Sequence, residues 1–171
     1  MNHTRRMVLM ALFIAMASVL HVVESWISLP LPVPGIKLGL ANIISLIVIA
    51  TFGWRDAMYI VIIRVFIASL FGGAFLGPAF AMSMSGAIVS TVVMSFVYGH
   101  WHHTFSFIGI SIIGAVAHNV AQIMMAALVV SSLTLLWYLP YLILFALPTG
   151  WVTGMTVIYF LAKTPKSILD N

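Results

Sequence analysis

Long apolar runs, broken only by short clusters of proline and glycine, most constrain how this chain can fold. A bilayer-spanning helix needs about 20 mainly apolar residues, and the chain holds about six runs of helical length. Only 6% of its residues are charged, whereas a soluble domain is typically about 25% charged. Lipid must therefore be the solvent over most of the surface, and the sequence predicts an all-α membrane protein with about six transmembrane helices.

The breaks between the runs place the helices. Arg5 and Arg6 precede the first run in the manner of a signal peptide, but the run is long and no small-residue cleavage site ends it. We therefore interpret it as a retained first helix. We expect a single membrane domain over 1–171, with helices at about 7–27, 38–52, 56–70, 79–98, 105–132 and 138–162.

The segment after the first helix points to a cavity. Pro30, Pro32, Pro34 and Gly35 exclude a helix there, because proline removes a backbone donor and disfavours helix in the residue before it. The next helix is short for a full span. Non-helical backbone at membrane depth survives only if it is buried in protein or lines a cavity.

Lysine and arginine in the loops predict the orientation. Lys37 falls on the side away from the termini, whereas the side of the termini holds Arg5, Arg6, Arg55, Lys163 and Lys166. The positive-inside rule then places both termini in the cytoplasm. We expect a multi-pass protein of the cytoplasmic membrane whose proline loop faces outward.

Charged residues within the helices are candidates for function. Arg64 falls near mid-bilayer, where an arginine costs about 2.5–3.5 kcal/mol on insertion scales and must find partners inside the bundle. A structural ion pair is the alternative to a functional role. Glu24, beside His21, has three interpretations: a snorkelling residue, a counter-charge to Arg64 or Lys37, or a substrate contact.

Amides and a histidine extend this set. His118, Asn119 and Gln122 share nearly one helix face, and Asn42 occurs at a depth compatible with Arg64. These residues either bond helices together or line a chamber, and we favour the chamber. The ligand would have an anionic or carbonyl-bearing end and an apolar body. The predicted outward pocket comprises Glu24, Lys37, Asn42, Arg64, His118, Asn119 and Gln122.

Small residues suggest close helix contacts. Ala11, Ala15 and Ser18 form a stripe on the first helix, which fits either packing within the bundle or docking of a partner helix. Tight packing inside the bundle is expected at four glycines, namely Gly86, Gly114, Gly150 and Gly154.

Several chemistries are not supported by the sequence. The chain has no cysteine, and its six histidines lack zinc-site spacing. We find no phosphate-binding loop for ATP and no aspartate-rich motif that would hold magnesium against a diphosphate. We therefore expect a protein that is not an enzyme and that has no metal or cofactor.

Four motifs carry a family resemblance over nearly the whole chain. They are PGIKLGLANI at 34–43, GWRDA at 53–57 with Arg64 after it, SMSGA at 83–87, and the segment from Gly109 to Gln122. Together they resemble the Gx transporter family, also labelled heptaprenyl diphosphate synthase component I. That family in turn is similar to the substrate-binding S components of energy-coupling factor (ECF) importers.

The resemblance implies a six-helix S-component-like bundle whose outward pocket is capped by the loop between the first two helices. The implied partners are an ECF transmembrane coupling subunit and two ATPases, with Ala11 and Ala15 matching the motif that contacts the coupling subunit. The substrate would be a small vitamin-, quinone- or isoprenoid-precursor-like molecule. The alternatives are a noncatalytic membrane subunit in polyprenyl diphosphate synthesis, or a purely structural subunit of a membrane complex.

Overall fold

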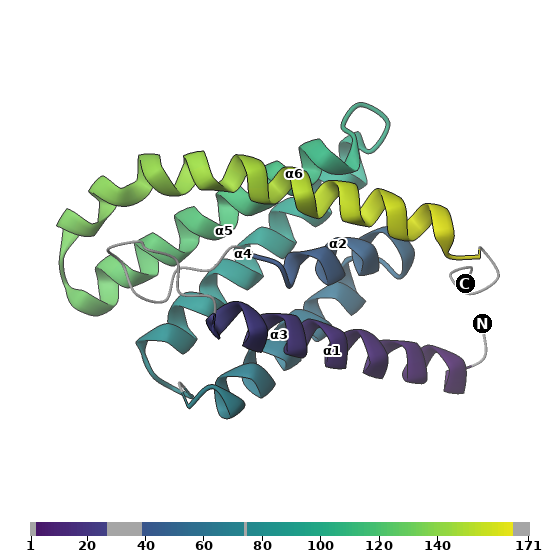
Figure 1. Ribbon diagram of the computed structural model, residues 1–171, viewed down its shortest axis with the longest axis horizontal. Helices are drawn as coiled ribbons and strands as arrows, with labels where there is room; N and C mark the ends of the chain where they lie inside the picture. Colours follow the sequence, from purple (N-terminus) through teal and green to yellow (C-terminus); the bar gives the residue numbers. More distant parts are fainter. Residues whose placement is uncertain (1–2, 27–38, 74, 166–171) are drawn as a thin grey trace.

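The computed structural model describes residues 3–26, 39–73 and 75–165, and every regular element in this part of the chain is helical. The prediction of an all-α protein with six helices is confirmed, with one additional 3-10 helix. In chain order the elements are α1 (His3–Trp26), α2 (Asn42–Thr51), α3 (Trp54–Phe71), α4 (Pro78–Trp101), α5 (Phe107–Val130), η1 (Leu133–Tyr138) and α6 (Leu139–Lys163) (Figure 1).

Four segments are long and apolar enough to cross a membrane: α1, α4, α5 and the continuous stretch of η1 and α6. The remaining two α-helices differ. α2 has only ten residues, and α3 carries Arg55, Asp56 and Arg64 among its 18 residues. That α2 and α3 also lie within the bilayer stays a prediction, as does the single domain over 1–171.

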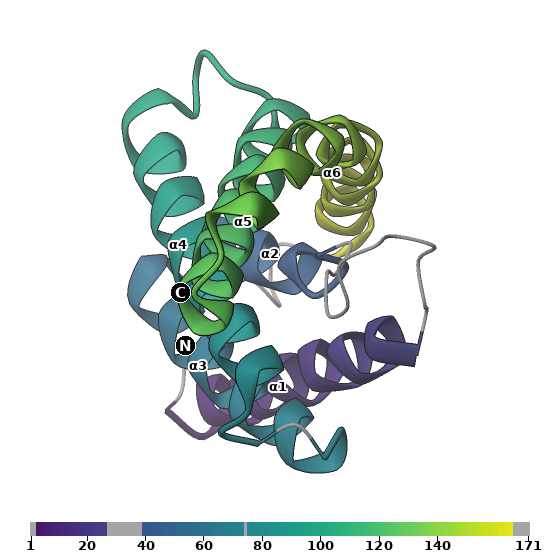
Figure 2. The same ribbon diagram turned by 90° about the vertical axis from the view of Figure 1, so that its left-hand side faces the viewer.

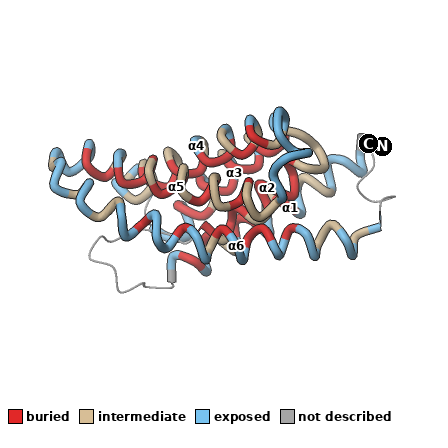
Figure 3. Tube along the Cα trace, turned by 90° about the horizontal axis from the view of Figure 1, so that it is seen from above, coloured by how far each residue is buried: buried red, intermediate tan, exposed pale blue. Residues whose placement is uncertain are grey.

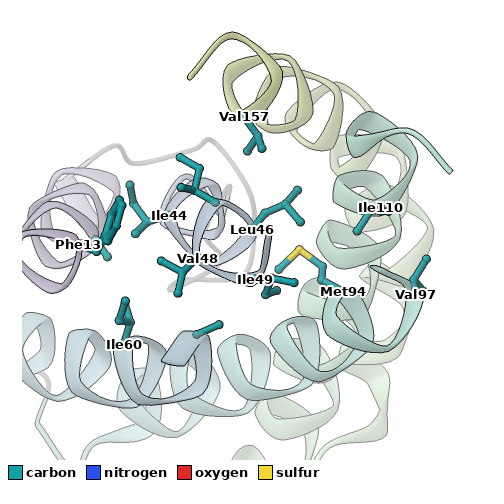
Figure 4. Close-up of a cluster of buried hydrophobic side chains, with 13 residues drawn as sticks. Phe13, Ile44, Leu46, Val48, Ile49, Ile60, Met94, Val97, Ile110 and Val157 are labelled. Carbon is teal, nitrogen blue, oxygen red and sulfur yellow. The ribbon is translucent and has the colours of Figure 1, made fainter. Parts of the chain in front are cut away.

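The short helix α2 lies at the centre of the bundle and contacts all five other α-helices. Its ten residues extend about 15 Å, roughly half of a hydrocarbon core about 30 Å thick. Seven of them are buried, which is expected for a helix that is apolar on every side. Figure 3 shows the buried stretches running through the middle of the bundle. The main core is built from Ile44, Leu46, Ile47, Val48 and Ile49 of α2, with Phe13, Ile60, Met94, Ile110 and Val157 from its neighbours (Figure 4).

The other helices are arranged around α2 in two groups. α1 makes its most extensive contacts with α3, whereas α5 packs along both α4 and α6. α2 lies between α1 and α6 (Figure 2). The first turn of α1 and the last turn of α6 lie at the same end of the bundle (Figure 1), where Arg6 and Asp56 form a salt bridge of 2.6 Å. We call this the terminal end.

Glycines allow close contact between α5 and α6. A Cβ added at Gly150 would lie 2.6 Å from the Cα of Ile112, and one at Gly154 would lie 2.5 Å from the Cα of Ile108. The Ser111 hydroxyl donates a hydrogen bond of 2.6 Å to the Gly150 carbonyl between these two contacts. Gly114 lies against the Met94 side chain of α4, where an added Cβ would be 2.4 Å from Met94 Cγ. These contacts confirm the predicted tight packing at the glycines.

Several helix boundaries differ by a few residues from the sequence-based expectation, and the differences at α2 and after α5 affect the architecture most. α2 begins at Asn42 rather than near residue 38. The reason is a turn at Gly39, which adopts φ +82° and whose carbonyl accepts a hydrogen bond of 2.8 Å from the Asn42 backbone amide. Asn42 is therefore the first residue of α2 and not one turn inside it. The segment expected to connect the last two helices contains η1.

Substituting Gly154 by alanine tests the α5–α6 contact. Its new Cβ meets backbone atoms of Ile108 that cannot move aside, and overpacking of this kind typically costs about 1–3 kcal/mol. Gly99→Ala is the matched control, because nothing lies within 4 Å of a Cβ at this helical position. We expect a lower unfolding temperature in detergent for Gly154→Ala only. Equal unfolding temperatures for both variants would contradict the tight contact.

Candidate ligand-binding site

The hairpin of α2 and α3 brings Asn42 and Arg64 together. The two helices are joined at Gly53, whose φ of +91° makes the tight turn between them possible. Asn42 lies nine positions before Thr51, and Arg64 lies ten positions after Trp54. At 1.5 Å per residue, both are therefore about 14–15 Å from the turn. At this common depth the Arg64 guanidinium donates a hydrogen bond of 3.2 Å from Nη2 to Asn42 Oδ1.

Arg64 is buried in the bundle with only 2% of its surface exposed. The Glu24 carboxylate of α1 is close enough to stabilise its positive charge electrostatically. Glu24 thus acts as a counter-charge to Arg64, one of the predicted alternatives. The Nε donor of the guanidinium has no acceptor among the described residues.

Glu24 links the end of α1 to the start of α2. Its side chain is 4% exposed, and its Oε1 accepts a hydrogen bond from the Gly39 amide. The snorkelling interpretation is therefore wrong, because the carboxylate lies inside the bundle. Gly39 in turn lies against Asn42, since a Cβ at this glycine would be 3.0 Å from Asn42 Nδ2. Glu24, Gly39, Asn42 and Arg64 thus form one buried cluster from three helices, which we call the Arg64 cluster.

The Arg64 cluster has more donors than acceptors. Asn42 Nδ2 and Arg64 Nε are both buried, and neither has an acceptor within the described parts of the chain. A buried donor without a partner costs about 1–3 kcal/mol, so an oxygen atom that reached either donor would be favoured. The chemistry of the cluster therefore suits an oxygen acceptor on a ligand.

A second set of polar side chains lies between α4 and α5. His118 and Gln122 face Gly86, where an added Cβ would be 3.0 Å from His118 Cε1 and 2.7 Å from Gln122 Cγ. Gln122 is fully buried, and neither atom of its amide has a hydrogen-bond partner among the described residues. Asn119 differs, because its Nδ2 donates a hydrogen bond of 2.9 Å to the Leu142 carbonyl of α6. Asn119 thus bonds two helices, whereas the Gln122 amide has capacity for a ligand.

The other predicted residues divide by exposure. Ala11 and Ala15 are exposed on α1, whereas Ser18, the third member of the stripe, is buried and bonds to the Ile14 carbonyl. Lys37 lies outside the described residues. Within those residues, no group of three or more metal-binding side chains occurs.

Gly39 is the member of the Arg64 cluster that sequence reasoning missed. Its signal was a glycine close to the start of a short apolar helix, where a left-handed backbone often makes a turn. The sequence predicted only close helix packing at Gly86. Its missing side chain also makes room for the polar face of α5.

Comparison with known proteins supports a family assignment. A family model described as heptaprenyl diphosphate synthase component I matches residues 13–160, which is most of the chain and includes every residue of the Arg64 cluster. No curated protein and no solved structure gives a match.

Substituting Gly39 by alanine should disrupt the Arg64 cluster. A left-handed backbone costs an alanine about 1–2 kcal/mol, and the added Cβ presses on Asn42 Nδ2. Gly73→Ala is the matched control, because Gly73 also has a positive φ (+66°) but nothing within 4 Å of an added Cβ. We expect Gly39→Ala to lower the unfolding temperature more than Gly73→Ala. A loss no larger than that of the control would mean that the Asn42 contact contributes nothing.

Proposed function

The chain belongs to the heptaprenyl diphosphate synthase component I family, and from this premise we propose that it is a noncatalytic membrane subunit that binds a small molecule for uptake. Arg64 and Asn42 hold the polar end of the ligand, and apolar side chains of the bundle surround the rest. Separate ATPases and a transmembrane coupling subunit supply the energy. The substrate class is a vitamin-, quinone- or isoprenoid-precursor-like molecule.

The observation that carries this proposal is the pair of buried donors on Arg64 and Asn42 that lack an acceptor among the described residues. A purely structural arginine would be expected to have its guanidinium fully satisfied. Buried, unsatisfied donors at mid-depth are instead typical of a membrane site whose ligand completes the hydrogen bonding. Gln122 would contribute a further amide, and His118, Asn119 and Lys37 stay candidates for ligand contact.

The distribution of acidic residues supports a noncatalytic role. Ionising an allylic diphosphate needs clustered carboxylates that hold magnesium. In the described part of the chain the acids are Glu24, which accepts from Gly39, and Asp56, which pairs with Arg6. They belong to different contacts on different helices, so they do not form such a cluster.

A second function is favoured by the family description. The chain would be an accessory membrane subunit of a polyprenyl diphosphate synthase, as the words "component I" suggest. This function requires a soluble synthase as partner instead of ATPases. The two functions therefore differ in what the protein assembles with.

The cytoplasmic membrane, with both termini inside, is the location that fits this function. Arg6 of α1 and Lys163 of α6 fall in the terminal turns that share one end of the bundle (Figure 1). Positive charge concentrated at one end favours the cytoplasmic side. The Arg64 cluster would then be reached from outside.

Arg64→Ala and Asn42→Ala test the binding site. Each removes a buried donor, so each should lower the amount of small molecule retained through detergent purification by about tenfold or more, as expected for loss of a charge-assisted hydrogen bond. Arg55→Ala is the control, since this arginine is exposed and lies over the Trp54 ring. Mass spectrometry of retained molecules gives the readout, and thermal unfolding verifies that each variant is folded. Full retention by folded Arg64→Ala would contradict the proposed site.

Tryptophan substitutions on α1 test the partner. Ala11→Trp and Ala15→Trp fill the exposed small positions, so they should reduce recovery of the coupling subunit and ATPases in affinity purification while ligand retention stays unchanged. Val92→Trp on α4 is the control, because Val92 is exposed on another helix. Recovery of a prenyl synthase without ATPases would support the second function instead, and unchanged recovery in all variants would remove Ala11 and Ala15 from the docking surface.

A further inference from the structure

The Arg64 cluster contains its own anion, and this suggests which ligands it accepts. We propose that Glu24 sets the charge selectivity of the site, so that it takes a neutral ligand with a carbonyl oxygen and rejects a carboxylate. This inference rests on the proposed binding function and names the substrate class of the same site.

Glu24 lies where a ligand anion would otherwise be expected to bind. Its carboxylate accepts the Gly39 amide directly before the first turn of α2, and it is close enough to stabilise Arg64. A helix N-terminus and a buried arginine are the two groups that most favour an anion in a membrane site. Glu24 therefore occupies the environment that a ligand carboxylate would otherwise take.

The charges of Arg64 and Glu24 balance each other. Arg64 and Glu24 are 2% and 4% exposed and carry opposite formal charges, so the pair adds no net charge to the described bundle. A ligand carboxylate would bring a second negative charge beside Glu24. At an effective dielectric constant of about 20, two like charges about 4 Å apart repel strongly. A neutral ligand avoids this repulsion.

The hydrogen-bonding groups of the cluster that lack a described partner favour an oxygen acceptor. Arg64 Nε and Asn42 Nδ2 are both donors, and both lack an acceptor among the described residues. A carbonyl oxygen accepts two hydrogen bonds without carrying a full charge. The ligand end that satisfies both the donors and the charge balance is therefore a ketone, quinone or amide carbonyl.

Benzamide and benzoate are suitable probes, because they share one shape and differ in charge. We expect the wild-type protein in detergent at pH 8 to bind benzamide more tightly than benzoate by about tenfold or more, given the like-charge repulsion. Apparent Kd values come from the rise in unfolding temperature with probe concentration.

Glu24→Gln should reverse this preference, because glutamine keeps an acceptor for the Gly39 amide but removes the charge. Asp56→Asn is the matched control: it removes the same charge from the other buried acid, which pairs with Arg6 at the terminal end. It should bind the probes in the wild-type order. Should Glu24→Gln fail to fold with Arg64 left uncompensated, the double variant Glu24→Gln/Arg64→Gln removes both charges and should show no preference for benzoate.

The outcomes separate the two proposals. A wild-type preference for benzoate, or an unchanged preference in folded Glu24→Gln, would overturn the role of Glu24 while leaving binding at the site intact. If neither probe binds the wild-type protein or Glu24→Gln, the proposed binding function falls, and the charge selectivity with it. The inference is supported if Glu24→Gln binds benzoate more tightly than benzamide while Asp56→Asn keeps the wild-type preference for benzamide.

Discussion

Buried backbone amides must find hydrogen-bond partners within the protein, and the arrangement of this bundle follows from that requirement at the start of α2. Gly39 and Asn42 are both buried there, away from solvent. The Gly39 amide donates to Glu24 of α1, the Asn42 backbone amide donates to the Gly39 carbonyl, and the Asn42 side-chain oxygen accepts from Arg64 of α3. Five helices surround the rest of α2, which leaves its apolar side chains in protein.

The same requirement gathers polar side chains around the start of α2. A full-length helix at the position of α2 would fill the bundle with apolar side chains at the depth of Arg64. The short helix instead leaves an arginine, an asparagine and a carboxylate together between three helices. The side chains that support the start of α2 are thus the same ones that the proposed binding function assigns to the ligand, and two of their donors have no acceptor among the described residues.

Sequence reasoning predicted the features that depend on composition and local spacing. The apolar runs predicted six helices, and Asn42 was expected at a depth compatible with Arg64, which agrees with the hydrogen bond between them. Contacts between distant helices could not be obtained this way. Glu24 had two candidate counter-charges, Arg64 and Lys37, and its proximity to Arg64 follows from the packing of α1 on α3. The bond from Asn119 to the Leu142 carbonyl depends on the separation of α5 and α6, which glycines set.

The glycine contacts between α5 and α6 bear on how such proteins diversify. Gly150 and Gly154 touch backbone of the neighbouring helix, so this half of the molecule tolerates little change in side-chain size. Glu24 and Asn42 contribute polar contacts from the opposite half. Under the proposed binding function, substitutions at Glu24 and Asn42 would alter which molecule is recognised without changing the glycine contacts between α5 and α6. The tightly packed helix pair would then act as a fixed scaffold, and changes in specificity would fall on side chains that lie away from the glycine contacts.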